Sequence, residues 1–185
     1  MEQDSLINPL EAQIRECYGR VVYSHKTQEK CADDFFKQNK TLKTIQIAIS
    51  ALTACGILAV VLTDNLVYEI VSSVVSLISL GVGLYLKEYD LGAIAQQHSD
   101  TATELWDIRE QYLSLLTDMN SGELAHDVAV ARRDSLQERL RNVYKRAPRT
   151  TAKAYRKAHK GIRENEEMYF SNEELNNLLP DVLRK

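Results

Sequence analysis

The chain has 185 residues, of which 44% are hydrophobic and 26% are charged, and its formal net charge is −3. This composition excludes collagen-like, low-complexity and largely disordered proteins, and the near-neutral charge excludes a polycationic nucleic-acid coat. Seven glycines and three prolines are too few for a turn-rich all-β fold, so the composition favours an all-α protein.

The first predicted helix begins near the N-terminus, where Asn8 is the expected N-cap, Pro9 stands in the first turn and Glu11 follows. Residues on one face then recur at three- and four-residue steps, which is the period of a helix. They are Leu10, Ile14, Cys17, Val21, Gln28, Cys31 and Phe35. No proline interrupts this segment, residues 8–43, so it is expected to run directly into the next one.

Two long apolar segments follow. The 43 residues between Lys43 and Lys87 contain no basic residue and only two acids, Asp64 and Glu69. The two predicted spans are residues 44–63 and 66–86. Each is long enough to cross the hydrocarbon core of a bilayer, which takes roughly 17–25 residues. A transmembrane helical hairpin is therefore predicted. The alternative is a buried hairpin in a soluble bundle, although such helices normally keep one polar face.

Basic residues flank only one end of the predicted hairpin. Those at this end are Lys37, Lys40, Lys43 and Lys87, whereas the turn between the spans holds Asp64, Asn65 and Glu69. The positive-inside rule then places both termini in the cytoplasm and the turn outside. Most of the chain is thus expected on the cytoplasmic side of the membrane.

Helical periodicity resumes after the second span. An apolar stripe predicts that residues 87–120 form a cytoplasmic helix that continues this span; its members are Leu91, Ala95, His98, Ala102, Leu105, Ile108, Tyr112, Leu116 and Met119. Gly122 breaks the pattern, and residues 121–185 form a helical extension. Its first stripe is Leu124, Val128, Ala131, Leu136, Leu140 and Val143, and Ser171 with Glu174 predicts a capping box for a last short helix. The long cytoplasmic helices are expected to pack into a bundle.

The sequence carries no catalytic or metal-binding signature. The four histidines are far apart in the chain, and Cys17, Cys31 and Cys55 form no C-x-x-C pair. His98 lies on an apolar stripe, where a core imidazole is the expected role, and the adjacent Asp33 and Asp34 point about 100° apart on a helix. No enzymatic activity, no cofactor and no metal site are therefore predicted.

Small and polar side chains form a stripe on each predicted span. The members are Gln46, Ser50 and Thr53 in the first span and Ser72, Ser76, Ser79 and Gly83 in the second. Such a stripe lets helices approach closely and hydrogen-bond, or it lines a water-filled path when several hairpins assemble. Both interpretations stay open, and the second requires an oligomer because two spans cannot enclose a path.

A basic helix face near the C-terminus is the second candidate surface, since residues 148–163 hold six basic residues and no acid. Its members are Arg149, Lys153, Arg156, Lys160 and Arg163. One interpretation is an anionic partner, namely nucleic acid, a nucleotide or an acidic protein surface. The alternatives are a solvated face, a face paired with the acids of residues 88–118, or contact with lipid headgroups.

Several local runs resemble the SLATT domain superfamily. They are residues 18–32 (YGRVVYSHKTQEKCA), 95–98 (AQQH) and 105–118 (LWDIREQYLSLLTD), in this order around the two spans. This superfamily consists of two-span effectors found beside nucleotide-signalling and reverse-transcriptase genes in bacterial conflict systems, and the extension after residue 120 resembles the reverse-transcriptase-associated branch. The resemblance implies an antiviral effector that forms pores in, or disrupts, the inner membrane.

The predicted function is a membrane effector of a bacterial antiphage system, which homo-oligomerises in the inner membrane and arrests the infected cell by abortive infection. The alternative is a membrane-anchored scaffold that recruits a cytoplasmic nucleic-acid or nucleotide-sensing complex without pore activity. A third possibility is a small regulated housekeeping channel. The expected partners are membrane lipid, further copies of the chain, and a reverse transcriptase with its nucleic acid or a nucleotide-signalling protein.

Overall fold

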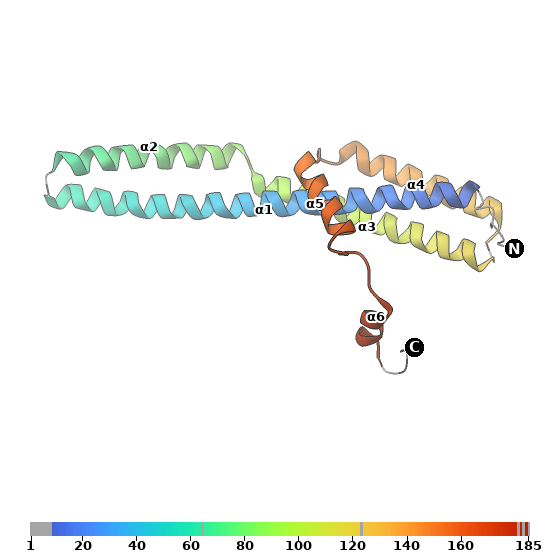
Figure 1. The fold of residues 1–185 in the computed structure, drawn as a ribbon. Coiled ribbons are helices and arrows are strands. Elements are labelled where there is room, and N and C mark those ends of the chain that lie inside the picture. Colours follow the sequence, from blue (N-terminus) through green and yellow to red (C-terminus); the bar gives the residue numbers. More distant parts are fainter. Residues whose placement is uncertain (1–8, 64, 123, 181, 183, 185) are drawn as a thin grey trace. The chain divides into compact units, whose positions relative to one another are not determined.

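The computed structural model describes residues 9–63, 65–122, 124–180, 182 and 184, and these residues form helices and no strand. The elements are α1 (Pro9–Thr63), α2 (Leu66–Glu88), α3 (Leu91–Ser121), α4 (His126–Arg146), α5 (Ala152–Arg163) and α6 (Asn172–Leu178) (Figure 1). The all-α prediction is confirmed. The predicted N-cap Asn8 and the turn residue Asp64 lie outside the described residues, as do four positions of the C-terminal extension.

The chain divides into two compact units. The bundle unit comprises residues 1–30 and 101–185, and the hairpin unit comprises residues 31–100. Each unit has its own packing, and α1 and α3 contribute residues to both.

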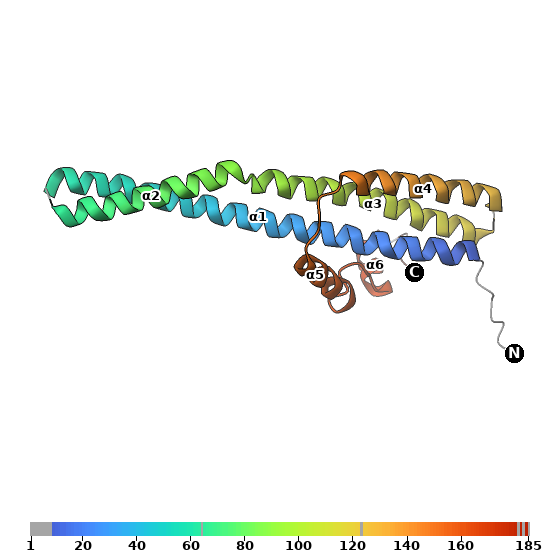
Figure 2. The ribbon, with the colours of Figure 1, turned by 90° about the horizontal axis from the view of Figure 1, so that it is seen from above.

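The bundle unit is built on three helices, α1, α3 and α4, which lie side by side (Figures 1 and 2). One hydrophobic cluster joins them; it contains Leu10, Ile14 and Val21 of α1, Leu105, Ile108, Tyr112 and Leu115 of α3, and Ala129, Leu136 and Val143 of α4. The stripes predicted for α1 and α3 supply most of these residues. Burial of such aliphatic and aromatic side chains, each worth about 1.5–3 kcal/mol when complete, holds the three helices together.

The buried face of α4 differs from the predicted one. Val128 and Ala131 are exposed, whereas Ala129 is buried together with Leu136 and Val143. These three buried residues are spaced seven apart, the repeat by which a helix keeps one seam against its neighbours. The prediction chose Val128 because valine is more apolar than alanine. In the structure the smaller Ala129 faces the core, and Val128 lies on the adjacent, exposed face.

The hairpin unit pairs the second part of α1 with α2, which runs in the opposite direction (Figures 1 and 2). Asn65 caps α2, since its side-chain oxygen accepts a hydrogen bond from the backbone N–H of Val67 at 2.9 Å. Two close approaches fix the register: Gly56 lies against Ser72, and Gly83 lies against Gln46.

The apolar side chains of the hairpin face outward. Both helices are long and apolar enough to cross a membrane, and none of the residues in their most apolar stretches is buried. Ile47, Leu62 and Leu77 are 71%, 81% and 69% exposed. A hairpin buried in a soluble bundle would hide such side chains, so their exposure agrees with the transmembrane prediction rather than with its alternative.

Residues 87–120 are not one helix with the second span, because Tyr89 and Asp90 interrupt it. Asp90 is the N-cap of α3, and its Oδ1 accepts a hydrogen bond from the backbone N–H of Ala93 at 2.9 Å. The apolar periodicity runs across this point without a proline, which is why the pattern alone predicted a continuous helix.

The C-terminal extension follows the local signals of the sequence closely. α3 ends where Gly122 adopts a φ of +76°, a conformation that favours glycine. Thr151 caps α5 by accepting from the backbone N–H of Ala154 at 3.1 Å. The predicted capping box of α6 is present: Ser171 and Glu174 exchange side-chain and backbone hydrogen bonds of 3.2 and 2.7 Å.

Candidate functional site

The polar stripe of the spans divides into two sets. One set is half-buried between α1 and α2; its members are Gln46, Thr53, Ser72, Ser79 and Gly83. Ser50 and Ser76 are exposed instead. The sequence pattern grouped all seven because steps of three and four residues describe a broad helix face, only part of which the neighbouring helix covers.

Small residues bring the two spans close together at the half-buried positions. A Cβ atom added to Gly56 would lie 2.5 Å from Oγ of Ser72, well inside van der Waals contact. A Cβ atom added to Gly83 would lie 3.4 Å from Nε2 of Gln46. Close approach through small residues is the usual way in which membrane helices gain packing energy, so the half-buried set serves the helix contact of a single chain.

The two outer sides of the hairpin differ in polarity. The half-buried contact residues of each helix recur at alternating steps of three and four residues. In an antiparallel helix pair, the positions that follow the contact residue before each four-residue step share one side, and the positions that precede the contact residue before each three-residue step share the other. We call the first side the polar flank; its exposed members are Lys43, Ser50, Ile57, Glu69 and Ser76. The second, the apolar flank, comprises Ile45, Leu52, Ala59, Val71, Ile78 and Tyr85. The exposed serine hydroxyls of the polar stripe, Ser50 and Ser76, therefore lie on the polar flank.

The predicted basic face lies on α5 and the linker before it. All five members, Arg149, Lys153, Arg156, Lys160 and Arg163, are exposed. The opposite face of α5 is buried against the bundle unit through Ala154, Ala158, Gly161 and Ile162. This helix is therefore amphipathic, with its small and apolar side chains used for packing and its cations directed outward.

Side chains from α1 hold α5 in place. The ring of Tyr23 lies 6.2 Å from the ring of Tyr155 and 6.2 Å from that of His159, measured between centroids. The Tyr23 hydroxyl accepts a hydrogen bond from Nε of Arg163 at 3.3 Å, and Nε2 of Gln28 donates to the carbonyl oxygen of the linker residue Pro148 at 3.3 Å. Tyr23 is thus the main contact point of α5, and no local pattern in the sequence marked it.

An ion-pair clamp fastens the segment after α5 to α1. The Glu167 carboxylate accepts hydrogen bonds from Nζ of Lys30 at 2.9 Å and lies 3.0 Å from Nζ of Lys26. These two ammonium groups, Lys30 foremost, lower the pKa of Glu167 to about 2. Gly161 makes room for the clamp, since a Cβ atom there would lie 2.9 Å from the carboxyl carbon of Glu167. The clamp joins residues 137 positions apart, which sequence spacing cannot reveal.

Among the described residues, three acids of residues 88–118 make ion pairs with arginines of α4. Nη1 of Arg132 lies 2.6 Å from Oδ2 of Asp118, and Nη2 of Arg139 lies 2.5 Å from Oδ2 of Asp107. The third pair joins Arg146 and Glu104. These arginines, spaced seven apart beside the buried seam of α4, pair with three of the acids that we considered as partners for the basic face.

His98 fits a structural role. His98 is buried and stacks on Phe35 with ring centroids 5.4 Å apart, and its burial lowers its pKa. Within the described ranges, no group of three His, Cys, Asp or Glu side chains is arranged to hold a metal ion. Cys17, Cys31 and Cys55 are free thiols.

Comparison with known proteins gives one family. Residues 10–174 match the SMODS and SLOG-associating 2TM effector domain family 4. This match extends the resemblance to SLATT domains beyond residue 120 and does not confirm the reverse-transcriptase-associated branch. Among curated proteins and solved structures, none matches the chain.

Proposed function

The chain belongs to the SMODS and SLOG-associating 2TM effector domain family, and we propose that this two-span effector domain acts in bacterial antiphage defence. Its proposed action is to permeabilise the inner membrane. In this proposal several copies assemble in the bilayer, the assembly leaks ions or small solutes, and the infected cell stops growing.

The observation that supports this proposal is the difference between the two flanks of the hairpin. A lone hairpin would expose the hydroxyl groups of Ser50 and Ser76 to lipid on one side, whereas the other side carries aliphatic side chains and Tyr85. Polar groups at membrane depth usually face other protein or a water-filled cavity. The polar flank is therefore suited to meet the polar flanks of further copies, whose hydroxyl groups then either bond across the contact or line a path.

The substitution Ser76→Leu tests this role. Leucine is at least as favourable as serine in hydrocarbon, so membrane insertion should be unchanged. If the polar flank lines a path, the larger apolar side chain should narrow and dewet it, and dye release from liposomes and growth arrest should be lost while cross-linked oligomers persist. If the flank only packs, the oligomers themselves should be lost.

Ala51→Leu is the matched control, because Ala51 lies on the outer face of α1, away from α2, and gains the same side chain. It should leave insertion, oligomers and leakage unchanged. Wild-type leakage and wild-type oligomers in Ser76→Leu would contradict a role for the polar flank.

A membrane-anchored scaffold without pore activity is the second candidate, and the exposed cations of α5 favour it. A scaffold needs no hydroxyl groups in its spans, so Ser76→Leu should leave it fully active. Reversal of charge at Arg156 and Lys160 should instead abolish recruitment of its cytoplasmic partner, with a marked dependence on salt.

A further inference from the structure

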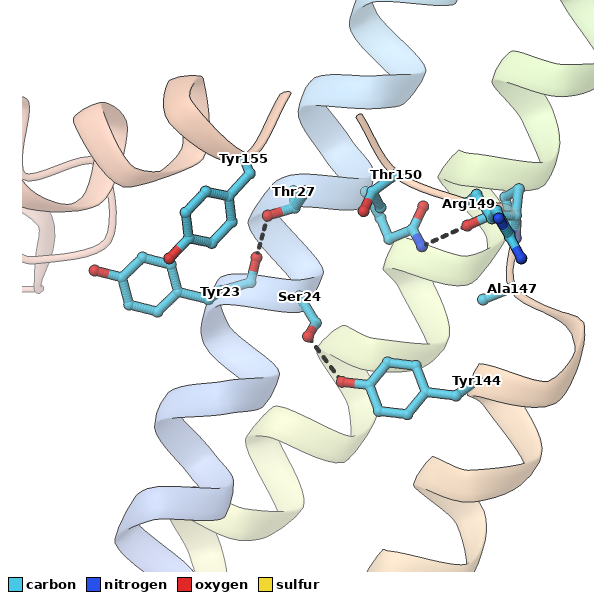
Figure 3. A pocket seen from close by; sticks show the side chains of 10 residues that line it. Tyr23, Ser24, Thr27, Tyr144, Ala147, Arg149, Thr150 and Tyr155 are labelled. Carbon is cyan, nitrogen blue, oxygen red and sulfur yellow. Dashed lines mark hydrogen bonds between the residues drawn. The ribbon is translucent and has the colours of Figure 1, made fainter. Parts of the chain in front are cut away.

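A pocket of about 460 Å³ opens at the start of the basic face, inside the bundle unit. It is bounded by α1, the end of α4, the linker that follows α4, and α5 (Figure 3). The lining side chains are those of Tyr23, Ser24, Thr27, Gln28, Tyr144, Ala147, Pro148, Arg149, Thr150 and Tyr155. Its volume lies within the range of about 300–1,000 Å³ that is usual for small-molecule sites.

Hydrogen bonds join the walls of this pocket. The hydroxyl groups of Ser24 and Tyr144 are 2.7 Å apart and join α1 to α4. Oγ1 of Thr27 is hydrogen-bonded to the backbone oxygen of Tyr23, and Gln28 holds the linker through Pro148. These contacts tie the Tyr144 hydroxyl and the linker to α1 without a ligand, which reduces the entropy that ordering them on binding would cost.

The pocket combines flat aromatic surfaces with a cation. Figure 3 shows the rings of Tyr23 and Tyr155 at one edge, with Arg149 at the opposite edge. Tyr155 remains 52% exposed despite its contact with Tyr23, so its ring is available for stacking. Among the described residues that line the pocket, none carries a carboxylate, and Arg149 is the one with a charged side chain. Aromatic rings beside an arginine are the combination with which proteins bind a base and its phosphate.

Other anionic partners fit these features less well. A helix that binds lipid inserts its apolar face, but Ala154, Ala158 and Ile162 of α5 are already buried against the bundle. An acidic protein surface would use the cations and leave the aromatic pocket empty. Only a ligand that carries both a planar ring and a negative charge uses the pocket and the basic face together.

We propose that this pocket binds a nucleotide, with its base against Tyr155 and Tyr144 and its phosphate at Arg149. Lys153, Arg156 and Lys160 continue from the rim of the pocket along α5 and bind the following phosphates when the nucleotide is part of a single strand. The proposal rests on the role of the basic face as a partner-binding surface and is independent of pore formation.

Fluorescence anisotropy tests this binding with the full chain in a neutral detergent. The probe is a labelled single-stranded oligonucleotide of about ten nucleotides, and unlabelled AMP is the competitor. Tyr155→Ala should weaken binding by about fivefold to about a hundredfold, because stacking on one aromatic ring is lost. Tyr155→Phe keeps the ring and should bind within about twofold of wild type. Arg149→Gln should reduce the slope of log affinity against log salt by about one.

Arg15→Gln is the matched control, since Arg15 is an exposed cation on α1 that pairs with Glu11 and lies outside the pocket. It should bind like wild type. Displacement of the probe by AMP identifies a single nucleotide as a sufficient ligand, and binding of the strand alone identifies single-stranded nucleic acid as the source.

Four outcomes would overturn the proposal. They are no binding of the labelled oligonucleotide, Tyr155→Ala binding as tightly as wild type, equal losses in Arg149→Gln and Arg15→Gln, and binding of anionic vesicles with the same dependence on Tyr155. Circular dichroism of each variant shows that its helices are intact. Loss of dye release in the experiments on Ser76 leaves this result unaffected, so the two proposals fail separately.

Discussion

Neutralising Glu167 should loosen the segment that follows α5. The wild-type carboxylate is paired with Lys30 and Lys26, and its pKa falls from the ordinary 4.5 to about 2. One pKa unit corresponds to about 1.36 kcal/mol, which sets an upper limit of about 3.4 kcal/mol on the contribution of the clamp. The side chain is still 30% exposed, so solvent screening reduces this, and we expect about 1 kcal/mol from Glu167→Gln.

Hydrogen exchange of the full chain measures this change. Peptides that cover residues 164–171 should exchange about fivefold faster in Glu167→Gln, because a local opening becomes about 1 kcal/mol easier. Glu166→Gln is the matched control, because the Glu166 carboxylate neighbours Glu167 in the chain, is also exposed and lies outside the clamp. The peptides of this variant should exchange like those of wild type.

The dependence on pH has a defined sign. Since the folded pKa of Glu167 is depressed, the clamp contributes fully above about pH 4.5, and its contribution is lost as the pH falls through about 2. The difference between wild type and Glu167→Gln, compared at matched pH, should therefore vanish near pH 2. Equal exchange in the Glu167 and Glu166 variants, or a difference that persists at pH 2, would refute the reasoning.

Two further predictions concern the hairpin. Gly56→Leu should destabilise the contact between the spans by about 1–3 kcal/mol in a mixed-micelle unfolding titration, because a Cβ atom added there already meets Ser72. Gly81→Leu is the control and should be neutral, since an added Cβ atom meets nothing within 4 Å. Similar losses of stability at both sites would contradict the close approach of the two spans. A reporter active only in the periplasm should function when inserted at Asn65 and stay silent at either terminus, because the basic residues flank the other end of the hairpin. An active fusion at the C-terminus would reverse the proposed orientation, and with it the cytoplasmic location of the basic face.

Signals that act within a few residues were readable from the sequence. The capping box of Ser171 and the break at Gly122 depend on backbone conformation and on neighbouring hydrogen bonds, so the residue types alone predict them. The two spans were equally clear, because the length of an uncharged run is a property of the chain and not of its packing. Asp90 is the exception. The apolar periodicity continues across it without a break, so the sequence predicted a continuous helix where Asp90 caps a new one.

Sequence periodicity located helix faces but not their partners. It placed Ser50 and Ser76 with Ser72 and Ser79, although only the last two meet the other span. Residues at steps of three and four spread over a broad part of the helix surface. The sequence pattern therefore does not show which side of the stripe the neighbouring helix covers.

The sequence by itself determined that this protein is helical, has two segments long and apolar enough to cross a membrane, and carries a basic face near its C-terminus. The tertiary structure alone decided which distant charges pair: Glu104, Asp107 and Asp118 of α3 pair with arginines of α4, whereas the basic face of α5 is exposed. It also brought Tyr23, Tyr144 and Tyr155 to one pocket. Tyr23 lies on α1, far along the chain from Tyr144 and Tyr155 on the consecutive helices α4 and α5. Such contacts follow from how hydrophobic faces pack against one another, not from any local pattern.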